Sequence, residues 1–369
     1  MKQKMIALFA VLALALTACG EDEAVVSPSP EQTNTPAPTP TVSVTPEVTP
    51  EPEPSPEPEY DGPVNPLTGL PIAEEALNDR PIAVMLNNLK QALPQLGNSQ
   101  ADIIYEVLAE GGITRMLGVY QSVEGVGEIG SVRSSRPYYL ELALGHDAIY
   151  LHAGGSEDAY SKIKEWGVTA LDCVRGPYEG SLYWRDKGRV SNNGWEHSVV
   201  TSGDKILELF PTYSFRKEHK EGYAYEMRFA KDGTPIDGQQ ALSIEVPFSP
   251  YKTGLFTYDA ETGKYLVEEF GAAYIDGNTG EQVAVTNVLV LQTACQLIRG
   301  DDAGRITVDL TGEGDGWFAC GGKIIPIRWS KEGRNEQFVY TTQSGELLTL
   351  GAGTSYVNII PLEKEITVN

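Results

Sequence analysis

Apolar positions in the first half of the chain form short runs typical of buried strands, separated by longer segments typical of helices. The short runs are bounded by Pro, Gly or Asn and cover residues 81–86, 102–108, 114–120 and 148–152. Two helices are predicted over 137–144 and 156–166, the first with a proline in its first turn and a glycine as its stop. Thr201 and Asp204 form a capping box for a third helix, which ends before Pro211. This alternation predicts an α/β layered domain over residues 63–220.

After residue 223 the apolar period changes to two, which is typical of half-buried strands. Gly, Asp and Asn separate the alternating segments, which cover residues 243–246, 255–258, 265–268, 283–291, 305–310, 323–329, 338–342 and 356–360. Many short strands with turn signals predict a mainly antiparallel all-β domain over 221–369, a sandwich or an open barrel. The expected fold class is therefore α+β with two domains, and the change of pattern lies between residues 213 and 240.

The first nineteen residues have the pattern of a secretory signal. Lys2 and Lys4 precede an apolar run over 6–16, which is too short to act as a membrane-spanning helix. The run Leu16-Thr17-Ala18-Cys19 resembles the lipobox of bacterial lipoproteins. That resemblance implies cleavage before Cys19 and a diacylglycerol on its sulfur, so the protein would be lipid-anchored to the cell membrane and face outside the cytoplasm. The alternative is an ordinary secretory signal in which Cys19 is incidental.

Residues 20–62 are dominated by Pro, Glu, Ser, Thr and Val, with almost no large apolar side chain and no Lys or Arg. Such a segment buries too little apolar surface to offset its conformational entropy. Its prolines favour an extended polyproline II conformation. The composition predicts a disordered Pro/Glu-rich spacer between the anchor and the folded part.

The charge balance excludes some classes of partner. The chain has 28 Lys and Arg against 51 Asp and Glu, a net charge of −23. Without the signal and the spacer, 26 basic residues remain against 41 acidic ones, a net charge of −15. An acidic protein is poorly suited to nucleic acid or to an anionic membrane face, because both are bound mainly through basic side chains.

Three cysteines remain beyond Cys19, and their spacing matches neither a zinc site nor a disulfide framework. Two arrangements stay open: a Cys295–Cys320 bridge with Cys173 free, or three buried thiols. No metal site is predicted.

Candidate anion-binding residues gather around the predicted start of the helix at Pro137. Arg133 and Arg136 lie three residues apart among serines, and guanidinium groups beside free helix N–H groups suit a phosphate or a carboxylate. The candidate anion site consists of Arg115, Arg133, Arg136, His152, Ser156, Arg185 and His197. The alternatives are that the arginines pair with Asp or Glu and that His152 is a structural histidine.

Asp102, Glu106 and Glu110 are the acidic candidates for acid/base or metal-associated roles. Asp102 has a structural alternative, which is to cap a turn before its strand. Recognised hydrolase and phosphate-loop motifs do not occur in the sequence, so the catalytic residues, if the protein is an enzyme, stay unknown.

Several longer stretches resemble the YerB-like bacterial lipoproteins, a two-domain family of unknown function. They are the runs over 80–88, 99–107, 110–115, 129–138 and 148–156 in the first part, and 258–265 and 351–361 in the second. The resemblance covers nearly all of the folded chain and implies the pair of domains and the cell envelope as the compartment. One departure concerns residues 195–198, where Trp-Glu-His-Ser stands in place of the family's usual Pro-His-Asn run.

Two functions from different classes follow. The first is a tethered binding or scaffold protein that holds an anionic cell-wall-related ligand or an envelope protein, without a cofactor. The second is an envelope enzyme acting on phosphate- or carboxylate-bearing wall polymers. The run Ser131-Val132-Arg133-Ser134-Ser135-Arg136-Pro137 is similar to the arginine motif of LytR-CpsA-Psr phosphotransferases. Mg²⁺ is expected only under this second alternative.

Overall fold

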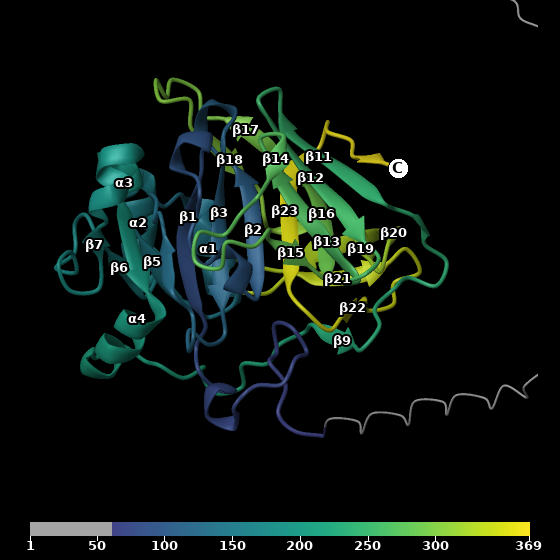
Figure 1. Ribbon diagram of the computed structural model, residues 1–369, viewed down its shortest axis with the longest axis horizontal. Coiled ribbons are helices and arrows are strands. Elements are labelled where there is room, and N and C mark those ends of the chain that lie inside the picture. The colour runs from purple at the N-terminus through teal and green to yellow at the C-terminus, as the bar shows by residue number, and fades with distance from the viewer. Residues whose placement is uncertain (1–60) are drawn as a thin grey trace, which may run out of the picture. The chain divides into compact units, whose positions relative to one another are not determined.

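The computed structural model describes residues 61–369, and its central element is a mixed sheet of eleven strands (Figure 1). The order across this large sheet is β10-β20-β19-β16-β23-β2-β3-β1-β5-β6, and β21 pairs with β20. In that order the strands are β10 (Gln239–Gln240), β20 (Lys323–Lys331), β19 (Gly312–Cys320), β16 (Asn287–Thr293), β23 (Ser355–Pro361), β2 (Ile103–Leu108), β3 (Thr114–Tyr120), β1 (Ile82–Asn88), β5 (Ile149–His152), β6 (Ala170–Asp172) and β21 (Val339–Thr342). The predicted signal, Cys19 and nearly all of the predicted spacer lie outside the described residues.

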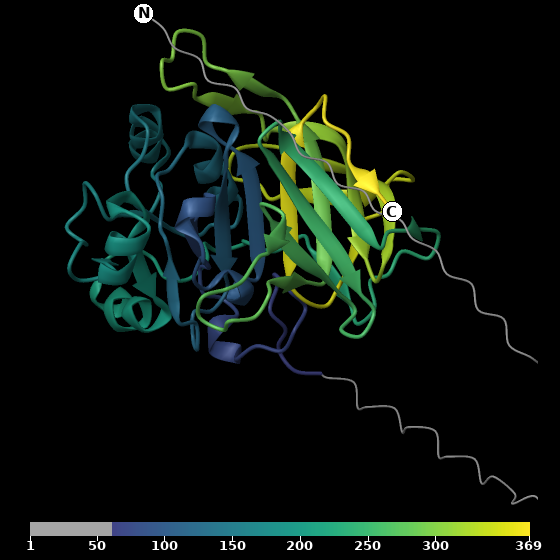
Figure 2. The ribbon, with the colours of Figure 1, turned by 45° about the horizontal axis from the view of Figure 1, so that its top comes forward.

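A smaller sheet of six strands lies across the C-terminal strands of the large sheet (Figure 2). Its strands are β14 (Ala272–Ala273), β13 (Lys264–Glu269), β12 (Lys252–Asp259), β11 (Ser243–Ser249), β24 (Thr367–Val368) and β15 (Ala284–Val285). Three minor sheets consist of β17 (Cys295–Leu297) with β18 (Ile306–Val308), β22 (Thr349–Gly351) with β9 (Arg228–Ala230), and β4 (Glu128–Gly130) with β8 (Val199–Ser202) and β7 (Trp184–Arg185).

The α-helices of the described residues all lie before residue 210. They are α1 (Pro137–Gly145), α2 (Glu157–Trp166), α3 (Lys187–Asn192) and α4 (Gly203–Leu209). Short 3₁₀ turns occur at Glu74–Ala76, Lys90–Ala92, Asn98–Gln100, Glu110–Gly112, Trp195–His197 and Phe210–Thr212. The chain therefore has mainly β content, as the second half of the sequence predicted.

The central strands of the large sheet are buried on both faces, which explains why they are mostly apolar runs rather than alternating ones. In β1, Val84 and Leu86 belong to the core that also holds residues of the smaller sheet, while Ala83 and Met85 belong to the core that holds the apolar residues of α1. All seven residues of β1 are buried. Because successive side chains of a strand point to opposite faces, this single strand contributes to two separate cores.

The two predicted parts of the chain share the large sheet. β2 pairs in parallel with β23 over residues 103–107 and 355–359, so a strand from each part lies side by side. β16 also pairs in parallel with β23, which makes the β-rich part mixed rather than uniformly antiparallel. The division near residue 220 stays a prediction, but hydrogen bonds join strands from both sides of it.

Most of the predicted elements of the first half are confirmed within one or two residues, and one detail is corrected. Ser202, not Thr201, caps α4, because the Ser202 side chain accepts a hydrogen bond from the Lys205 N–H. Thr201 instead donates its hydroxyl to the Leu182 carbonyl inside the core.

Cys173, Cys295 and Cys320 are all free thiols, so the Cys295–Cys320 bridge is absent, and only Cys295 is partly exposed.

Candidate functional site

A pocket of about 350 Å³ lies at the carboxyl ends of the parallel strands β5 and β6. Figure 1 shows these strands beside α2 and β7. This is the edge at which open α/β sheets bind ligands. We call it the arginine pocket, because three of its lining residues are arginines and only one is acidic. Its lining residues are Val132, Arg133, Ser134, Ala153, Gly154, Gly155, Tyr160, Val174, Arg175, Arg185, Trp195, Glu196 and Val199.

The pocket opens where an extended segment separates the ends of β1 and β5. These strands pair directly only from Ile82 to Val84. Beyond that point the Arg133 N–H donates to the Met85 carbonyl, and the Ala153 N–H donates to the Arg133 carbonyl, at 2.9 and 3.0 Å. Residues 131–135 thus run between the two strand ends and hold Arg133 at the pocket by main-chain hydrogen bonds.

Arg133 keeps unused hydrogen-bonding capacity. Its Nη1 donates to the Glu196 carbonyl at 2.6 Å, and its guanidinium lies 3.4 Å from the Glu196 carboxylate. Its Nε is buried and has no hydrogen-bond partner among the described residues. The Arg133 side chain is 14 % exposed, whereas that of Glu196 is 72 % exposed. An unpaired buried donor costs free energy, so an additional acceptor at this place would be favourable.

The other two arginines lie flat on aromatic rings. Arg175 stacks 3.7 Å from the Tyr160 ring centroid, and Arg185 stacks 4.0 Å from that of Trp195. Each also pairs with an exposed carboxylate outside the pocket lining, Arg175 with Glu157 and Arg185 with Glu179 at 2.9 Å. Stacking fixes the orientation of a guanidinium while its edge stays able to donate hydrogen bonds.

Asp172, which the sequence reading missed, organises the turn beside the pocket. Its carboxylate accepts hydrogen bonds from the N–H groups of Gly154, Val174 and Arg175 at 2.7, 2.9 and 3.0 Å, and from the Tyr160 hydroxyl at 2.8 Å. Burial alone would raise the pKa of Asp172, but neighbouring His152 and these donors outweigh burial and lower it. Because its acceptor sites are occupied, Asp172 has a positioning role at the pocket.

The structure separates the predicted anion site into two groups. Arg133 and Arg185 line the arginine pocket, while Arg115 and Arg136 both bind Glu110. Arg136 donates to the two oxygens of Glu110 from Nη2 and Nε at 2.6 and 3.1 Å. Burial alone would raise the pKa of Glu110, but the two guanidiniums outweigh it and lower that pKa. For Arg115, Arg136 and Glu110 the structural alternative fits, since one carboxylate pairs with both guanidinium groups.

The remaining predicted residues of the anion site have structural contacts. Ser156 caps α2 by accepting from the Ala159 N–H. His152 is buried with Nδ1 2.8 Å from the Gly154 carbonyl, and burial lowers its pKa. The two ring nitrogens of His197 lie 2.8 and 2.7 Å from the side-chain amides of Asn87 and Gln91. Burial also lowers the pKa of His197, so both histidines are neutral near pH 7.

Asp102 and Glu106 lie away from the arginine pocket. Asp102 accepts from the Asn65 amide at 2.9 Å and from the Gln121 N–H at 2.6 Å, which is the capping alternative, and burial raises its pKa to about 6. Glu106 is fully buried between the sheets, where Lys252 Nζ lies 2.9 Å from its Oε1. Its partners Lys252 and Glu269 carried no signal in the sequence reading, because each stands singly in an alternating strand.

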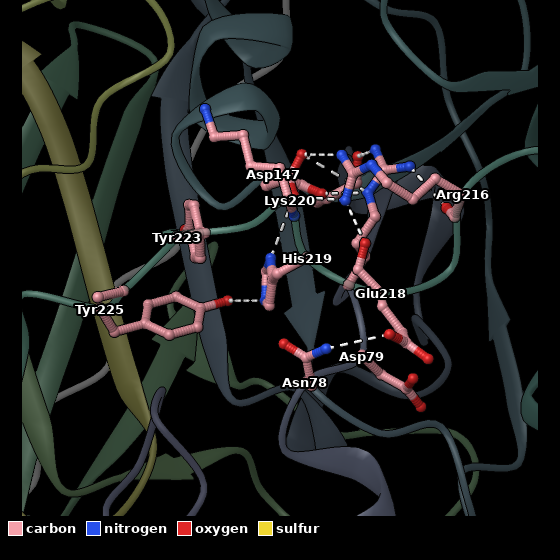
Figure 3. A network of polar contacts seen from close by, with 12 residues as sticks. Asn78, Asp79, Asp147, Arg216, Glu218, His219, Lys220, Tyr223 and Tyr225 are labelled. Carbon is pink, nitrogen blue, oxygen red and sulfur yellow. Dashed lines mark hydrogen bonds and ion pairs between the residues drawn. The ribbon is translucent and has the colours of Figure 1, made fainter.

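A second polar cluster, shown in Figure 3, joins residues 216–225 to the rest of the fold. Asp147 lies at its centre and pairs with Arg216 at 2.6 Å and with His219 at 3.2 Å (Figure 3). Tyr225 lies beyond His219, with its hydroxyl 3.5 Å from Nε2. Burial alone would raise the pKa of Asp147, but His219 and Arg216 outweigh it and lower that pKa. These contacts fasten residues 216–225 to the loop between α1 and β5.

A cavity of about 490 Å³ lies at the opposite ends of β1 and β5, with Ile82, Ile149 and Phe210 among its lining residues. Its two cations are already bound by the protein. Arg80 donates to the carbonyls of Asp147, Ala148 and Arg216, and Lys217 donates to that of Tyr213. The arginine pocket is therefore the better candidate for a charged ligand.

Within residues 61–369, no group of three or more His, Cys, Asp or Glu side chains is arranged to hold a metal ion. In the same range, none of the helices has the length and the apolar character needed to cross a bilayer.

Comparison with known proteins shows which family has this architecture. The profile described as "Protein of unknown function (DUF3048) N-terminal domain" matches residues 67–216, and that of the corresponding C-terminal domain matches residues 244–357. The chain is 31 % identical over 302 residues to "Putative lipoprotein YerB" of Bacillus subtilis (strain 168), covering 80 % of this chain and 86 % of that protein. The chain belongs to the YerB family.

A crystal structure of YerB from Bacillus subtilis supports the same conclusion at the level of the fold. It matches with a TM-score of 0.71 and 28 % sequence identity, covering 82 % of this chain and 99 % of that chain. The family resemblance predicted from the sequence is thus confirmed, and with it an arrangement in two parts. The family description assigns no reaction, so the function has to be argued from the pocket.

Proposed function

We propose that this YerB-family protein is a lipid-anchored binding protein on the outer face of the cell membrane, and that its arginine pocket binds an anionic cell-wall-related ligand. The observation that carries the proposal is the convergence of Arg133, Arg175 and Arg185 on one pocket of a strongly acidic chain. Guanidinium groups recognise phosphate and carboxylate through paired, charge-assisted hydrogen bonds.

The carboxylates that now pair with these arginines do not argue against a ligand. Glu196 and Glu157 are 72 % and 83 % exposed, and Glu179 is 46 % exposed. Exposed ion pairs contribute only about 0–1 kcal/mol, so an anion that contacts several arginines can displace them. The pair of Arg115 and Arg136 differs, because Glu110 is largely buried between them.

The acidic groups at the pocket are poorly suited to catalysis, so binding is the favoured function. Glu196 is the only carboxylate of the lining, and Asp172 beside it is occupied by four donors. A general base must be held in position beside the proton it removes, whereas the Glu196 side chain is 72 % exposed. The wall-polymer phosphotransferase and its Mg²⁺ stay a second hypothesis for which this pocket supplies no specific support.

The anchor rests on the Leu16-Thr17-Ala18-Cys19 run and on the similarity to a protein named as a lipoprotein. A diacylated cysteine contributes about 0.8 kcal/mol for each buried methylene, so two acyl chains hold a protein stably at a bilayer. A tethered pocket of this kind would bind polymers or proteins close to the membrane.

Isothermal titration calorimetry with inorganic pyrophosphate tests the pocket. The Arg133→Ala variant should bind about ten- to a hundredfold more weakly, since a charge-assisted contact contributes roughly 1.5–3 kcal/mol. Arg328→Ala is the matched control, because Arg328 forms an exposed pair with Asp315 on the large sheet, outside the pocket. Equal affinity of the wild type and Arg133→Ala, or no measurable binding by the wild type, would overturn the proposal.

A further inference from the structure

We infer that the anionic group bound by the arginine pocket is carried by a sugar ring that stacks on the exposed ring of Trp195. The ligand class is thus a sugar phosphate or an acidic sugar. This inference rests on the proposed function and names the chemistry of the ligand beyond its charge.

Trp195 is exposed to an unusual extent for a tryptophan. The chain has five tryptophans, and Trp195 is the only one of them among the exposed large apolar side chains, at 63 %. The Arg185 guanidinium lies 4.0 Å from its ring centroid, yet most of the Trp195 side chain stays exposed. An exposed ring at the edge of a cationic pocket is suited to contact a ligand that enters the pocket.

The backbone of Trp195 is held in place, so the ring is a fixed feature of the pocket edge. The Trp195 carbonyl accepts hydrogen bonds from Arg185 Nη1 at 3.0 Å and from the Ser198 hydroxyl at 2.7 Å. Two residues further on, His197 is buried against the amides of Asn87 and Gln91. A ring placed in advance loses little conformational entropy when a ligand stacks on it.

The rest of the pocket edge fits a ring with both apolar and polar edges. Val174, 56 % exposed, is the second exposed apolar side chain of the lining, after Trp195. Glu196 adjoins Trp195, and once a ligand anion replaces it at Arg133 its carboxylate is free to accept hydroxyl groups. A sugar has an apolar C–H face, which would pack on Trp195, and several hydroxyl groups, which would donate to Glu196.

The dimensions agree with a small ligand of this kind. The pocket of about 350 Å³ falls in the range of small-molecule sites. Arg133 belongs to the extended segment 131–135 and its side chain is only 14 % exposed, whereas Trp195 and Val174 are exposed. The anion would therefore enter first, and the ring would remain at the edge, where a longer glycan could continue into solvent.

The test compares glucose 1-phosphate, inorganic phosphate and adenosine monophosphate by calorimetry with the wild type, Trp195→Ala, Trp195→Phe and Tyr251→Ala. Tyr251 is a 79 % exposed aromatic residue outside the arginine pocket and serves as the control. We expect the wild type to bind glucose 1-phosphate about three- to tenfold more tightly than phosphate, as an aromatic contact would provide. Trp195→Ala should lose that preference, Trp195→Phe should keep part of it, and Tyr251→Ala should keep all of it.

The outcomes separate this inference from the proposed function. If phosphate binds and depends on Arg133, but glucose 1-phosphate has no advantage or keeps it in Trp195→Ala, only the sugar inference fails. Tighter binding of adenosine monophosphate than of glucose 1-phosphate would also overturn it, in favour of a stacked base. If no anion depends on Arg133, the proposed function itself fails.

Discussion

Lys252 Nζ lies 2.9 Å from Glu106 Oε1, and both side chains are at least 98 % buried. Glu106 belongs to β2 of the large sheet and Lys252 to β12 of the smaller one, so this contact joins the two sheets. Glu269 of β13 also contacts Lys252, and the Tyr356 hydroxyl donates to Glu106 at 2.6 Å. One ammonium group therefore lies between two buried carboxyl groups, which cannot both ionise without repulsion.

The first prediction concerns the dependence of stability on pH. Burial, with the nearby Glu106 charge, raises the pKa of Glu269 from 4.5 to about 8 in the folded protein. The folded state keeps a proton that the unfolded state loses between these values, so this group's contribution to the free energy of unfolding falls as pH rises from 4.5 towards 8. Glu269→Gln, which mimics the protonated carboxyl, should flatten that dependence in urea unfolding at several pH values. Parallel curves for the wild type and the variant would contradict this account.

A second prediction concerns Glu110. Glu110→Ala removes the shared partner of Arg115 and Arg136, whose side chains are 5 % and 9 % exposed. Uncompensated buried charges of this kind cost about 3–5 kcal/mol of stability. Urea unfolding should show a loss of this order, whereas Glu208→Ala, at an exposed pair with Lys205, should change stability by less than about 0.5 kcal/mol. A loss for Glu110→Ala as small as that for the control would mean that the arginines find other partners.

Arg133 and Arg136 show what could be predicted from the sequence and what could not. Arg133 and Arg136 are three residues apart, a spacing that places side chains together on a helix. The segment before α1 is extended, however, and its residues alternate between two sides. Arg133 therefore reaches the pocket and Arg136 reaches Glu110. The spacing can be seen in the sequence. Whether it brings the two side chains together depends on the backbone conformation, which is determined by pairing with β1 and β5.

The same limit applies to the fold. The strands β1, β2, β3 and β5 were predictable because they are short, mostly apolar runs between turn residues. The strand β19, by contrast, contains Gly314 and Gly316, which weaken a strand pattern. A Cβ on Gly314 would lie 2.6 Å from the Trp329 indole, and one on Gly316 would lie 2.4 Å from the Val290 carbonyl. These glycines permit close packing against β20 and β16, and that requirement appears only once the sheet has formed.

The third prediction concerns the carboxylate that competes with the ligand. Glu196→Gln removes the charge opposite Arg133, so inorganic pyrophosphate should bind about two- to fivefold more tightly, in line with the small free energy of an exposed ion pair. The corresponding change Glu208→Gln, outside the pocket, should leave the affinity unchanged. Weaker binding by Glu196→Gln would show that the carboxylate supports the anion indirectly rather than competing with it.

The fourth prediction concerns the anchor. Replacing Cys19 by Ala removes the sulfur that the lipobox resemblance assigns to the diacylglycerol, so the protein should move from the membrane fraction into the medium or the periplasm. Fractionation and immunoblotting of cells expressing the wild type, Cys19→Ala and Cys173→Ala would measure this. Cys173 is a buried free thiol and provides the control for loss of a cysteine as such. Continued membrane association of Cys19→Ala would mean that another feature holds the protein there.

The most direct test of the central claim is an anomalous difference map from crystals of this protein soaked in tungstate, a heavy oxyanion analogue of phosphate. The account predicts a peak in the arginine pocket within hydrogen-bond distance of the Arg133 guanidinium, with Arg175 or Arg185 as a second contact, and no such peak in crystals of Arg133→Ala. Tungstate bound elsewhere, for example at Arg216, with an empty arginine pocket in the wild type, would contradict it.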